Sequence, residues 1–167
     1  MGGGGVNAQA APEYFFPEGK APSSYTKAIL EKDGATLPFA DTRDFEERKR
    51  GFIAPAEDLK IMADAGHVAW DMARFDFLND SKGFDSVHPS LHRISTLNMN
   101  YGLYEVIPGI YQVRGFDLAD ISFVRGKTGW IVVDPLTSRE TAAAAMAFAR
   151  QHLGDKPVSA IIFTHSH

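Results

Sequence analysis

The sequence predicts an α/β fold in which a helical N-terminal arm precedes a layered domain. Two segments, 109–116 and 121–135, are rich in the β-branched and aromatic residues that favour strands. An alanine-rich helical segment follows, and a continuous apolar run over 158–164 comes after it. The order strand, hairpin, helix, strand is typical of α/β layers, in which a helix packs on a sheet.

The composition argues against several classes of protein. The 167 residues include 17 Lys and Arg against 21 Asp and Glu, and the net charge of −4 is too small to indicate binding to nucleic acid or to a membrane surface. No apolar run approaches the roughly 18 residues that a membrane-spanning helix needs. Because the sequence has no cysteine, any metal ion must be bound by His, Asp or Glu.

Residues 1–38 are rich in Pro, Gly, Ala and Ser, and we expect them to form an extended arm. The four glycines near the start are typical of a flexible linker. Ala8 and Ala10 flank Gln9 in the small-x-small pattern of a signal-peptidase site, although the basic and apolar regions of a signal peptide do not precede it. Residues 1–12 are therefore interpreted as a linker or a processing remnant of a periplasmic or secreted protein. The alternative is a cytoplasmic protein with an Ala/Gly tail that carries no signal.

Residues 39–96 predict a helical segment that packs on the following domain. Asp41 is the expected N-cap of a short charged helix, and Gly51 is its expected stop. Between Pro55 and Leu78 the apolar residues recur at broadly helical spacing, which predicts two helical pieces separated by a glycine. The polar residues that follow predict a long, turn-rich connection.

Residues 97–167 predict the start of the layered domain. The strands of its hairpin are joined by the turn Gly126–Gly129. Thr137 and Glu140 form a T-x-x-E capping box for the next helix, and Gly154 is expected to end it. The continuous apolar run that follows is expected to be a central strand covered on both faces.

His165 and His167 lie where this apolar strand ends. In extended backbone, side chains two residues apart point to the same face, so the two imidazoles could bind one divalent ion. Open α/β sheets place their sites at the carboxyl ends of strands, which agrees with a metal site here. The alternatives are an ordinary solvated turn and the remains of a purification tag.

Asp134 ends another predicted strand, and Pro135 prevents that strand from continuing. A carboxylate at this position could orient a ligand histidine through its second ring nitrogen. The alternative is that Asp134 only caps the turn before the helix. We expect the ends of both strands to lie on the same edge of the sheet.

Four segments of the chain carry a resemblance to a known family. They are DTRDFEERKRGFIAP at 41–55, HPSLHR at 88–93, GIYQVRGFDLADISFVRGKTGWIVVDPLTSRETA at 109–142 and VSAIIFTHSH at 158–167. Together they resemble the zinc-dependent alkylsulfatases of the metallo-β-lactamase superfamily. The resemblance covers nearly all of the chain after the first dozen residues.

This resemblance implies the N-terminal part of a metallo-β-lactamase-like αβ/βα sandwich. In the family a T-H-S-H-x-D-H motif supports a site with two zinc ions, and His165 and His167 match its first two ligands. The Asp and His of the motif would follow His167. We therefore expect an N-terminal fragment that is inactive alone and contains no catalytic residue. The complete protein would be a homodimer that hydrolyses alkyl sulfate esters, detergents included, to alcohol and inorganic sulfate with zinc-activated water.

Two further expectations follow from the resemblance. The loop after Arg114 corresponds to a flap near the site of the superfamily, so Phe116 and Leu118 are candidates for contact with an alkyl tail. Arg114 and Arg125 are the arginines of the predicted strands, and we interpret both as structural.

His88 and His92 stand where the family usually has Asn and Trp, which leaves the substrate preference open. The other interpretation of both histidines is simple packing within a loop.

Two other functions are compatible with the sequence. A lactonase or thioesterase of the same superfamily would share the fold and the histidine pair, but not the agreement at 41–55 and 88–93. The chain could also be a non-catalytic piece that is completed by a companion chain or by the remainder of the same polypeptide.

Overall fold

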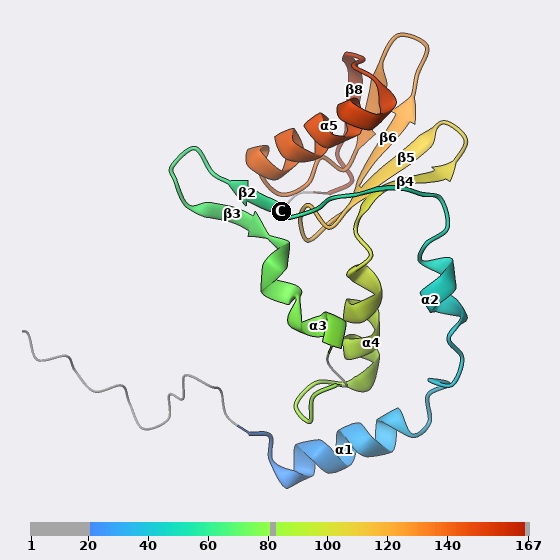
Figure 1. The fold of residues 1–167 in the computed structure, drawn as a ribbon, viewed down its shortest axis with the longest axis vertical. Coiled ribbons are helices and arrows are strands. Elements are labelled where there is room, and N and C mark those ends of the chain that lie inside the picture. The colour runs from blue at the N-terminus through green and yellow to red at the C-terminus, as the bar shows by residue number, and fades with distance from the viewer. Residues whose placement is uncertain (1–20, 81–82, 166–167) are drawn as a thin grey trace, which may run out of the picture.

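A six-stranded sheet, crossed on one face by a long helix, forms the upper part of the molecule in Figure 1, and shorter helices extend below it. The computed structural model describes residues 21–80 and 83–165. Its elements follow in this order: α1 (Ser24–Gly34), α2 (Arg43–Glu47), β1 (Phe52–Pro55), β2 (Lys60–Met62), β3 (Val68–Asp71), the 3-10 helix η1 (Met72–Phe75), α3 (Phe77–Asp80), α4 (Pro89–Asn98), β4 (Gly102–Ile107), β5 (Ile110–Arg114), β6 (Ile121–Arg125), β7 (Trp130–Val133), α5 (Arg139–Leu153) and β8 (Val158–Ile162). The predicted α/β class is confirmed.

The sheet has the strand order β1-β4-β5-β6-β7-β8. All neighbours are antiparallel except β7 and β8, which run parallel because α5 returns the chain between them. The strands β1, β5, β7 and β8 therefore end at one edge of the sheet, which is called the histidine edge below. The loops after β5, β7 and β8 all lie at this edge.

The core lies between this sheet and α5. Side chains alternate along the strands, so that Phe123 and Trp130 are fully buried while their neighbours point to the other face. From the helix, Ala145 and Ala149 face the sheet, and their small side chains allow a close approach. Burying a large apolar side chain contributes roughly 1.5–3 kcal/mol, which makes this layer the main source of stability.

The helical prediction for Pro55–Leu78 is wrong over most of its length. Pro55 ends a strand of the main sheet, and β2 and β3 form an antiparallel hairpin. The hairpin turns at Gly66, which has φ of +87°, a value that glycine adopts readily. The apolar residues of a short hairpin that packs on one side recur closely enough to imitate helical spacing. Only η1 and α3, at the end of the segment, are helical.

Two other elements depart from the sequence-based predictions. The N-terminal arm was expected to be extended, but it contains α1, which is capped by the Ser23 side chain accepting a hydrogen bond from Thr26 N. Residues 1–12, including the possible processing site, lie outside the described residues. The predicted turn-rich connection is shorter than expected, because α4 begins at Pro89.

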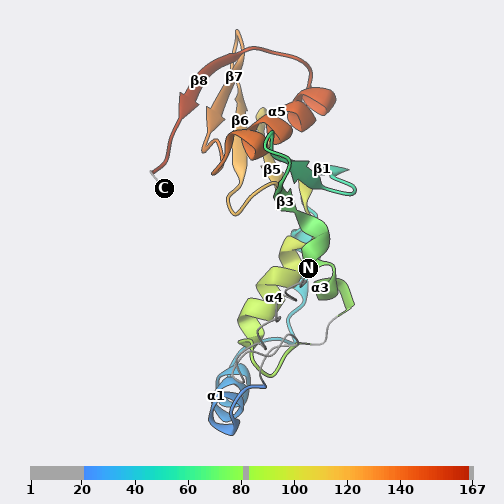
Figure 2. The same ribbon diagram turned by 90° about the vertical axis from the view of Figure 1, so that its left-hand side faces the viewer.

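The strand β8 is parallel to β7, as α5 requires, but it lies at the end of the strand order rather than in the centre of the sheet. All five of its residues are exposed, and Phe163 just after it is 71% exposed. Figure 2 shows that α5 does not extend over this strand. The prediction of a strand covered on both faces is therefore wrong for the structure described here.

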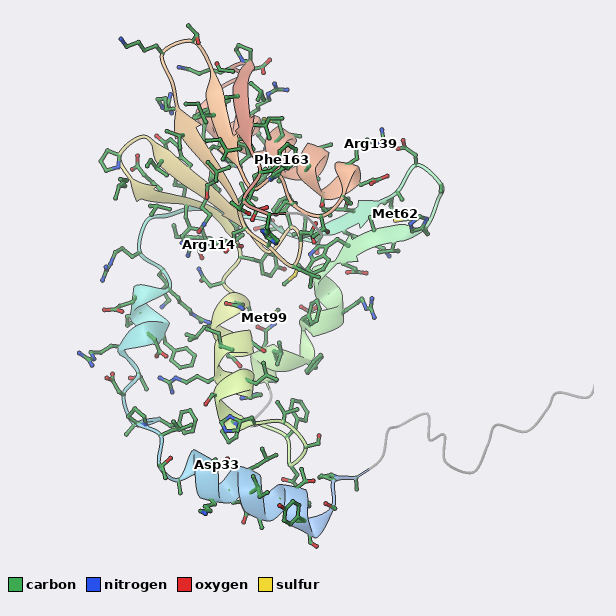
Figure 3. All side chains as sticks on the ribbon, turned by 180° about the vertical axis from the view of Figure 1, so that it is seen from behind. Asp33, Met62, Met99, Arg114, Arg139 and Phe163 are labelled. Carbon is green, nitrogen blue, oxygen red and sulfur yellow. The ribbon has the colours of Figure 1, made fainter. Side chains whose placement is uncertain are left out.

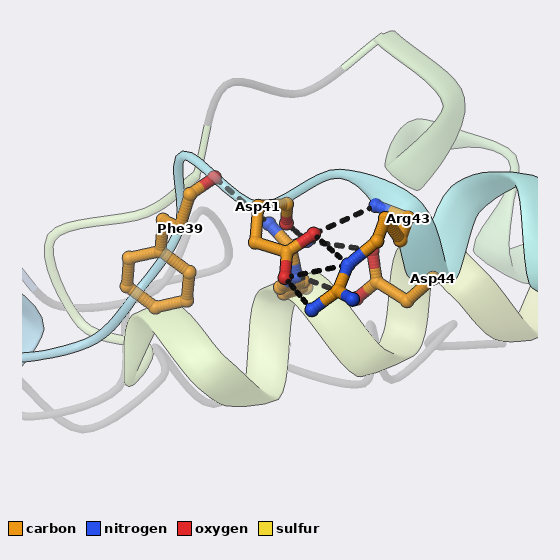
Figure 4. Close-up of polar contacts among 5 residues, drawn as sticks. Phe39, Asp41, Arg43 and Asp44 are labelled. Carbon is orange, nitrogen blue, oxygen red and sulfur yellow. Dashed lines mark hydrogen bonds and ion pairs between the residues drawn. The ribbon is translucent and has the colours of Figure 1, made fainter.

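A cluster of contacts around Arg93 holds the helices below the sheet together. Its guanidinium donates two hydrogen bonds to Asp44, at 2.8 and 2.6 Å, and a longer one to Phe39 O at 3.3 Å. The same group stacks over the ring of Phe45, 5.0 Å from its centroid. Figure 4 shows Asp41 and Arg43 paired beside this cluster. These contacts connect α2 to α4, and the boundaries of a separate 39–96 segment remain a prediction.

A buried carboxylate, Asp117, connects the loop after β5 to the start of α5. It accepts hydrogen bonds from Thr137 N at 2.9 Å, from Thr141 Oγ1 at 2.6 Å and from Leu118 N at 2.6 Å. The hydroxyl of Thr137 also donates to it. The N-terminus of α5 adds a favourable field for a negative charge.

The helix cap consequently differs from the predicted capping box. Ser138, one residue after Thr137, is the N-cap, and its Oγ accepts from Thr141 N at 3.1 Å. Thr137 cannot cap the helix in the same way because its hydroxyl is directed to Asp117. The predicted end of the helix at Gly154 is confirmed, with φ of +97°.

Burial alone would raise the pKa of Asp117, but the hydrogen bonds from Thr141, Thr137 and Leu118 outweigh it and hold the pKa below its ordinary value of 3.8. Its contribution to stability is therefore present above this ordinary value and is lost as the pH falls through the lower, folded-state pKa.

We predict that Asp117→Asn lowers the free energy of unfolding by about 1–3 kcal/mol at pH 7, since an amide cannot accept all these hydrogen bonds. Urea unfolding at pH 7 and at pH 3 measures this, and the difference should shrink at the lower pH. Asp64→Asn is the control, because Asp64 also bonds to the start of α5, through Arg139, but its side chain is 78% exposed. Equal losses in the two variants at pH 7 would contradict the prediction.

Candidate metal centre

Three loops meet at the histidine edge because their strands run in the same direction. They follow β5, β7 and β8, and the register places Val133 beside Ile162 and Ser122 beside Val133. The backbone of Asp134 extends this pairing by donating from its N–H to Ile162 O at 2.9 Å. The sequence-based expectation that Asp134 and the histidine segment share one edge is therefore confirmed by the strand pairing.

Asp134 and His165 are connected through the side chain of Thr164. The Thr164 hydroxyl donates to Asp134 Oδ2 at 3.1 Å, and its Oγ1 lies 2.8 Å from Nδ1 of His165. From the sequence, Asp134 was expected to orient a histidine directly, and Thr164 was not anticipated as the intermediate. Asp134 has φ of +57°, so its backbone is in the left-handed region at the point where the chain leaves the strand.

The second predicted ligand, His167, lies outside the described residues. Among those that are described, no group of three or more His, Asp or Glu side chains is arranged to hold a metal ion. The described part of the site is the segment from Asp134 to His165.

The donors in this segment fit zinc chemically. Imidazole nitrogen is a common zinc ligand, and a ligand histidine usually forms a hydrogen bond through its other ring nitrogen. In His165 the contact with Thr164 involves Nδ1, so Nε2 is the atom that would face a metal ion. Catalytic zinc sites typically have three protein ligands, so the two histidines would need at least one more.

The structure separates the two candidates for contact with an alkyl tail. Phe116 is 3% exposed and packs in the core, with its ring 5.2 Å from that of Phe148 on α5. Leu118, two residues later, is 86% exposed. Of the two, Leu118 is therefore the side chain that a substrate can reach without rearrangement of the core.

Both strand arginines make packing contacts, as expected. The guanidinium of Arg114 lies 4.0 Å from the ring centroid of Tyr104, and its Nε donates to Gln112 Oε1 at 2.7 Å. Arg125 stacks over Trp130 at 5.0 Å and donates to the hydroxyl of Tyr111 at 3.2 Å. These contacts hold both side chains against aromatic rings of the sheet.

His88 and His92 lie at α4, away from the histidine edge: His88 immediately precedes the helix and His92 is within it. Nδ1 of His88 accepts a hydrogen bond from Ser90 N at 3.2 Å and so caps the helix. Asn, the residue more usual in the family, is also a preferred N-cap, so the exchange preserves this role. The ring of His92 packs edge-on against Phe84, 5.8 Å away.

The residues that position the loop after β5 were not predicted from the sequence. Asp117 has its partners 20 and 24 residues further along the chain, so no local pattern marks it as a structural carboxylate. Trp70, on the unpredicted hairpin, donates from Nε1 to Gly115 O at 2.7 Å. Recognition of the hairpin would have been needed to find this contact.

The sequence of this chain is similar to those of known proteins. The profile of the metallo-beta-lactamase superfamily matches residues 114–167. Among curated proteins, an (R)-specific secondary-alkylsulfatase of Pseudomonas sp. is 43% identical over 90% of this chain. A linear primary-alkylsulfatase of Pseudomonas sp. is 41% identical over 89% of it. An alkyl/aryl-sulfatase of Saccharomyces cerevisiae is 38% identical over 86% of it. The chain spans 22% of the length of each of these relatives.

The solved structures agree with the sequence comparisons. The stereoselective inverting sec-alkylsulfatase Pisa1 from Pseudomonas sp. superposes with a TM-score of 0.78 at 44% identity. The match covers 89% of this chain and 23% of that protein. The fold described above is thus the same as the corresponding part of a solved alkylsulfatase, and the chain belongs to the alkylsulfatase family of the metallo-β-lactamase superfamily.

Proposed function

We propose that this chain is part of a zinc-dependent alkylsulfatase, which hydrolyses alkyl sulfate esters to an alcohol and inorganic sulfate. The observation that carries the proposal is the identity of more than 40%, over about nine-tenths of the chain, to both a secondary and a primary alkylsulfatase. Because the two relatives differ in the position of the ester, the alkyl sulfate is the property that they have in common. Detergents such as dodecyl sulfate belong to this class.

The proposed metal ligands within this chain are His165 and His167. Zinc supplies an activated water molecule and polarises the ester oxygens. Asp134 orients Thr164, whose hydroxyl in turn contacts Nδ1 of His165 and fixes the rotation of the ring. Leu118, exposed on the same edge, contacts the alkyl group of the ester.

Further parts of the proposed enzyme must come from outside this chain. They include the remaining ligands for two zinc ions and the cationic groups that hold an anionic sulfate ester. The remainder of the same polypeptide is the proposed source, and a companion chain is the alternative. We further propose a homodimer and a periplasmic or secreted location. Within 21–80 and 83–165, no helix is both long and apolar enough to cross a membrane.

We predict that His165→Ala and His167→Ala each remove zinc and sulfatase activity from the full-length protein. Each substitution removes an imidazole ligand, and catalytic zinc sites have few ligands to lose. Metal analysis and sulfate release from dodecyl sulfate measure the outcome. His88→Ala is the control, since His88 caps α4 away from the histidine edge. Wild-type zinc content and turnover in His167→Ala would refute the assignment.

We predict that Asp134→Asn and Thr164→Val each weaken zinc retention about 10- to 100-fold, the usual effect of losing a group that orients a ligand. Competition with a chelator measures the zinc affinity, and circular dichroism verifies the fold. Thr164→Ser keeps the hydroxyl and should retain wild-type affinity. If Thr164→Val binds zinc as tightly as Thr164→Ser, the hydrogen bonds from Asp134 to His165 do not orient the ligand.

We predict that the 167-residue chain alone releases no sulfate. Two histidines do not complete a catalytic zinc site, and the exposed apolar strand β8 favours aggregation or pairing with another chain. The test is to mix the purified chain with zinc and dodecyl sulfate and to measure inorganic sulfate. The full-length protein serves as the positive control. Catalytic release by the short chain, with no second polypeptide present, would show that the ligands proposed to lie elsewhere are not needed.

A further inference from the structure

We propose that the aromatic segment Tyr14–Phe16 docks into a cavity between α1 and α4 of the same chain. The segment lies outside the described residues, and its place is inferred from the cavity and from its sequence. This inference does not depend on the proposed sulfatase activity. α1 crosses the end of the helical region that is remote from the sheet. In Figure 3, Asp33 marks α1, and Met99 marks the end of α4 beside the sheet.

The helices of this region lack the buried layer that usually stabilises a helix. All residues of α1, α2 and α4 are described, and none of them is buried. With 11, 5 and 10 residues, these helices are too short to be stable in water without packing against other elements. A further segment is therefore needed to cover their apolar side chains.

A cavity lies between α1, α4 and the segments beside them. α1 approaches the start of α4 at one end, where a Cβ on Gly34 would lie 3.0 Å from Cγ of Pro89. Further along α1, Lys27 Nζ pairs with Asp85 Oδ2 at 2.5 Å. The cavity beside these contacts has a volume of about 540 Å³. Its apolar wall is formed by Leu30, Phe39, Phe45, Phe84, Val87 and Pro89.

The lining favours aromatic side chains over a charged ligand. The lysine of the wall, Lys27, already pairs with Asp85. The arginine, Arg93, already pairs with Asp44. Phe84 is 43% exposed although it lines the cavity, so a further ring can cover it, and aromatic rings attract one another beyond the gain from burial. Since an apolar cavity of about 150 Å³ can hold a benzene ring, this one has room for more than one aromatic side chain.

Residues 12–17, with the sequence PEYFFP, supply matching side chains. Pro12 and Pro17 have a fixed φ and disfavour helix at the residue before them, so the segment between them favours an extended backbone. In extended backbone, Tyr14 and Phe16 point to one face and Phe15 to the other. The cavity therefore receives Tyr14 and Phe16, and Phe15 stays outside.

The segment is long enough to reach the cavity. The described residues begin at Ala21, and the five residue steps back to Phe16 can span about 17 Å when extended. Along α1, the distance from Ser24 to Glu31 is only about 10 Å. The chain can therefore turn back beside α1 and bring Phe16 to Leu30 and Glu31, which line the cavity.

The short connection favours docking within one chain. A tethered segment has an effective concentration in the millimolar range at a site that it can reach. A second copy, or a later part of a longer polypeptide, would have to compete with it. Once docked, the segment supplies the layer that α1 and α4 lack.

The test measures trypsin cleavage after Lys20 in the full-length protein. Lys20 is the first Lys or Arg of the sequence and lies between the aromatic segment and α1, so a cut there reports release of the segment. The cleavage rate follows the population of the released form when release and docking are fast. Phe16→Ala and Phe84→Ala should each raise this rate about 10-fold or more, since each removes a ring from the contact.

Phe15→Ala and Phe75→Ala are the matched controls. Phe15 is expected to point away from the cavity, and Phe75 is 37% exposed, similar to Phe84, but does not line the cavity. Both variants should be cleaved at the wild-type rate. The combination of Phe16→Ala with Phe84→Ala should raise the rate by clearly less than the product of the two single effects, because both remove the same contact. This non-additivity separates docking from a general loosening of the helices.

The same measurement identifies any other occupant. Wild-type rates in Phe16→Ala and Phe84→Ala would overturn the inference and point to a later part of the polypeptide as the cover. Equal effects of Phe15→Ala and Phe16→Ala, or of Phe75→Ala and Phe84→Ala, would also overturn it. Co-expression of the Phe16→Ala and Phe84→Ala chains should not restore protection. Restored protection would show that the segment docks into a second copy, since a mixed pair holds one intact segment and one intact cavity.

Discussion

The burial of one carboxylate, Asp117, determines how the histidine edge is assembled. Taking a charge out of water is costly, and it is tolerated here because Thr137, Thr141 and Leu118 supply hydrogen bonds. These donors come from the loop after β5 and from the start of α5, which the chain reaches only after completing two more strands. The carboxylate therefore fixes the loop after β5 relative to the segment that begins at Asp134. Neither could shift without leaving a buried charge unpaired.

The sheet is covered unevenly, in a way that agrees with a larger assembly. One face is sealed by α5 and by the hairpin of β2 and β3, while β8 and Phe163 leave apolar surface in contact with water. Sheet surfaces of this kind are usually covered by another element or another chain. Since the relatives are several times longer than this chain, the rest of such a protein is the simplest source of that cover.

The parts of the fold that the sequence predicts well are those whose causes are local. Strand patterns marked β5, β6 and β7, and Gly154 marked the end of α5. The hairpin of β2 and β3 was missed because short strands and helices give similar apolar spacings. The site shows the same division. Asp134 was found because it ends a recognisable strand, but its link through Thr164 depends on two strand ends meeting, and the partners of Asp117 lie 20 or more residues away.

Because β5, β7 and β8 run in the same direction, the opposite ends of these strands are far from the histidine edge and are suitable places for an inserted sequence. The turn between β6 and β7, closed by the bond from Gly126 N to Gly129 O, lies at the edge of the sheet opposite Asp134. Lys127 and Thr128 at its tip are exposed, and exposed loop tips tolerate insertion. A fluorescent reporter or an affinity handle placed between these two residues would leave the histidine edge intact. The same insertion before Ser138 would displace the donors that keep Asp117 buried.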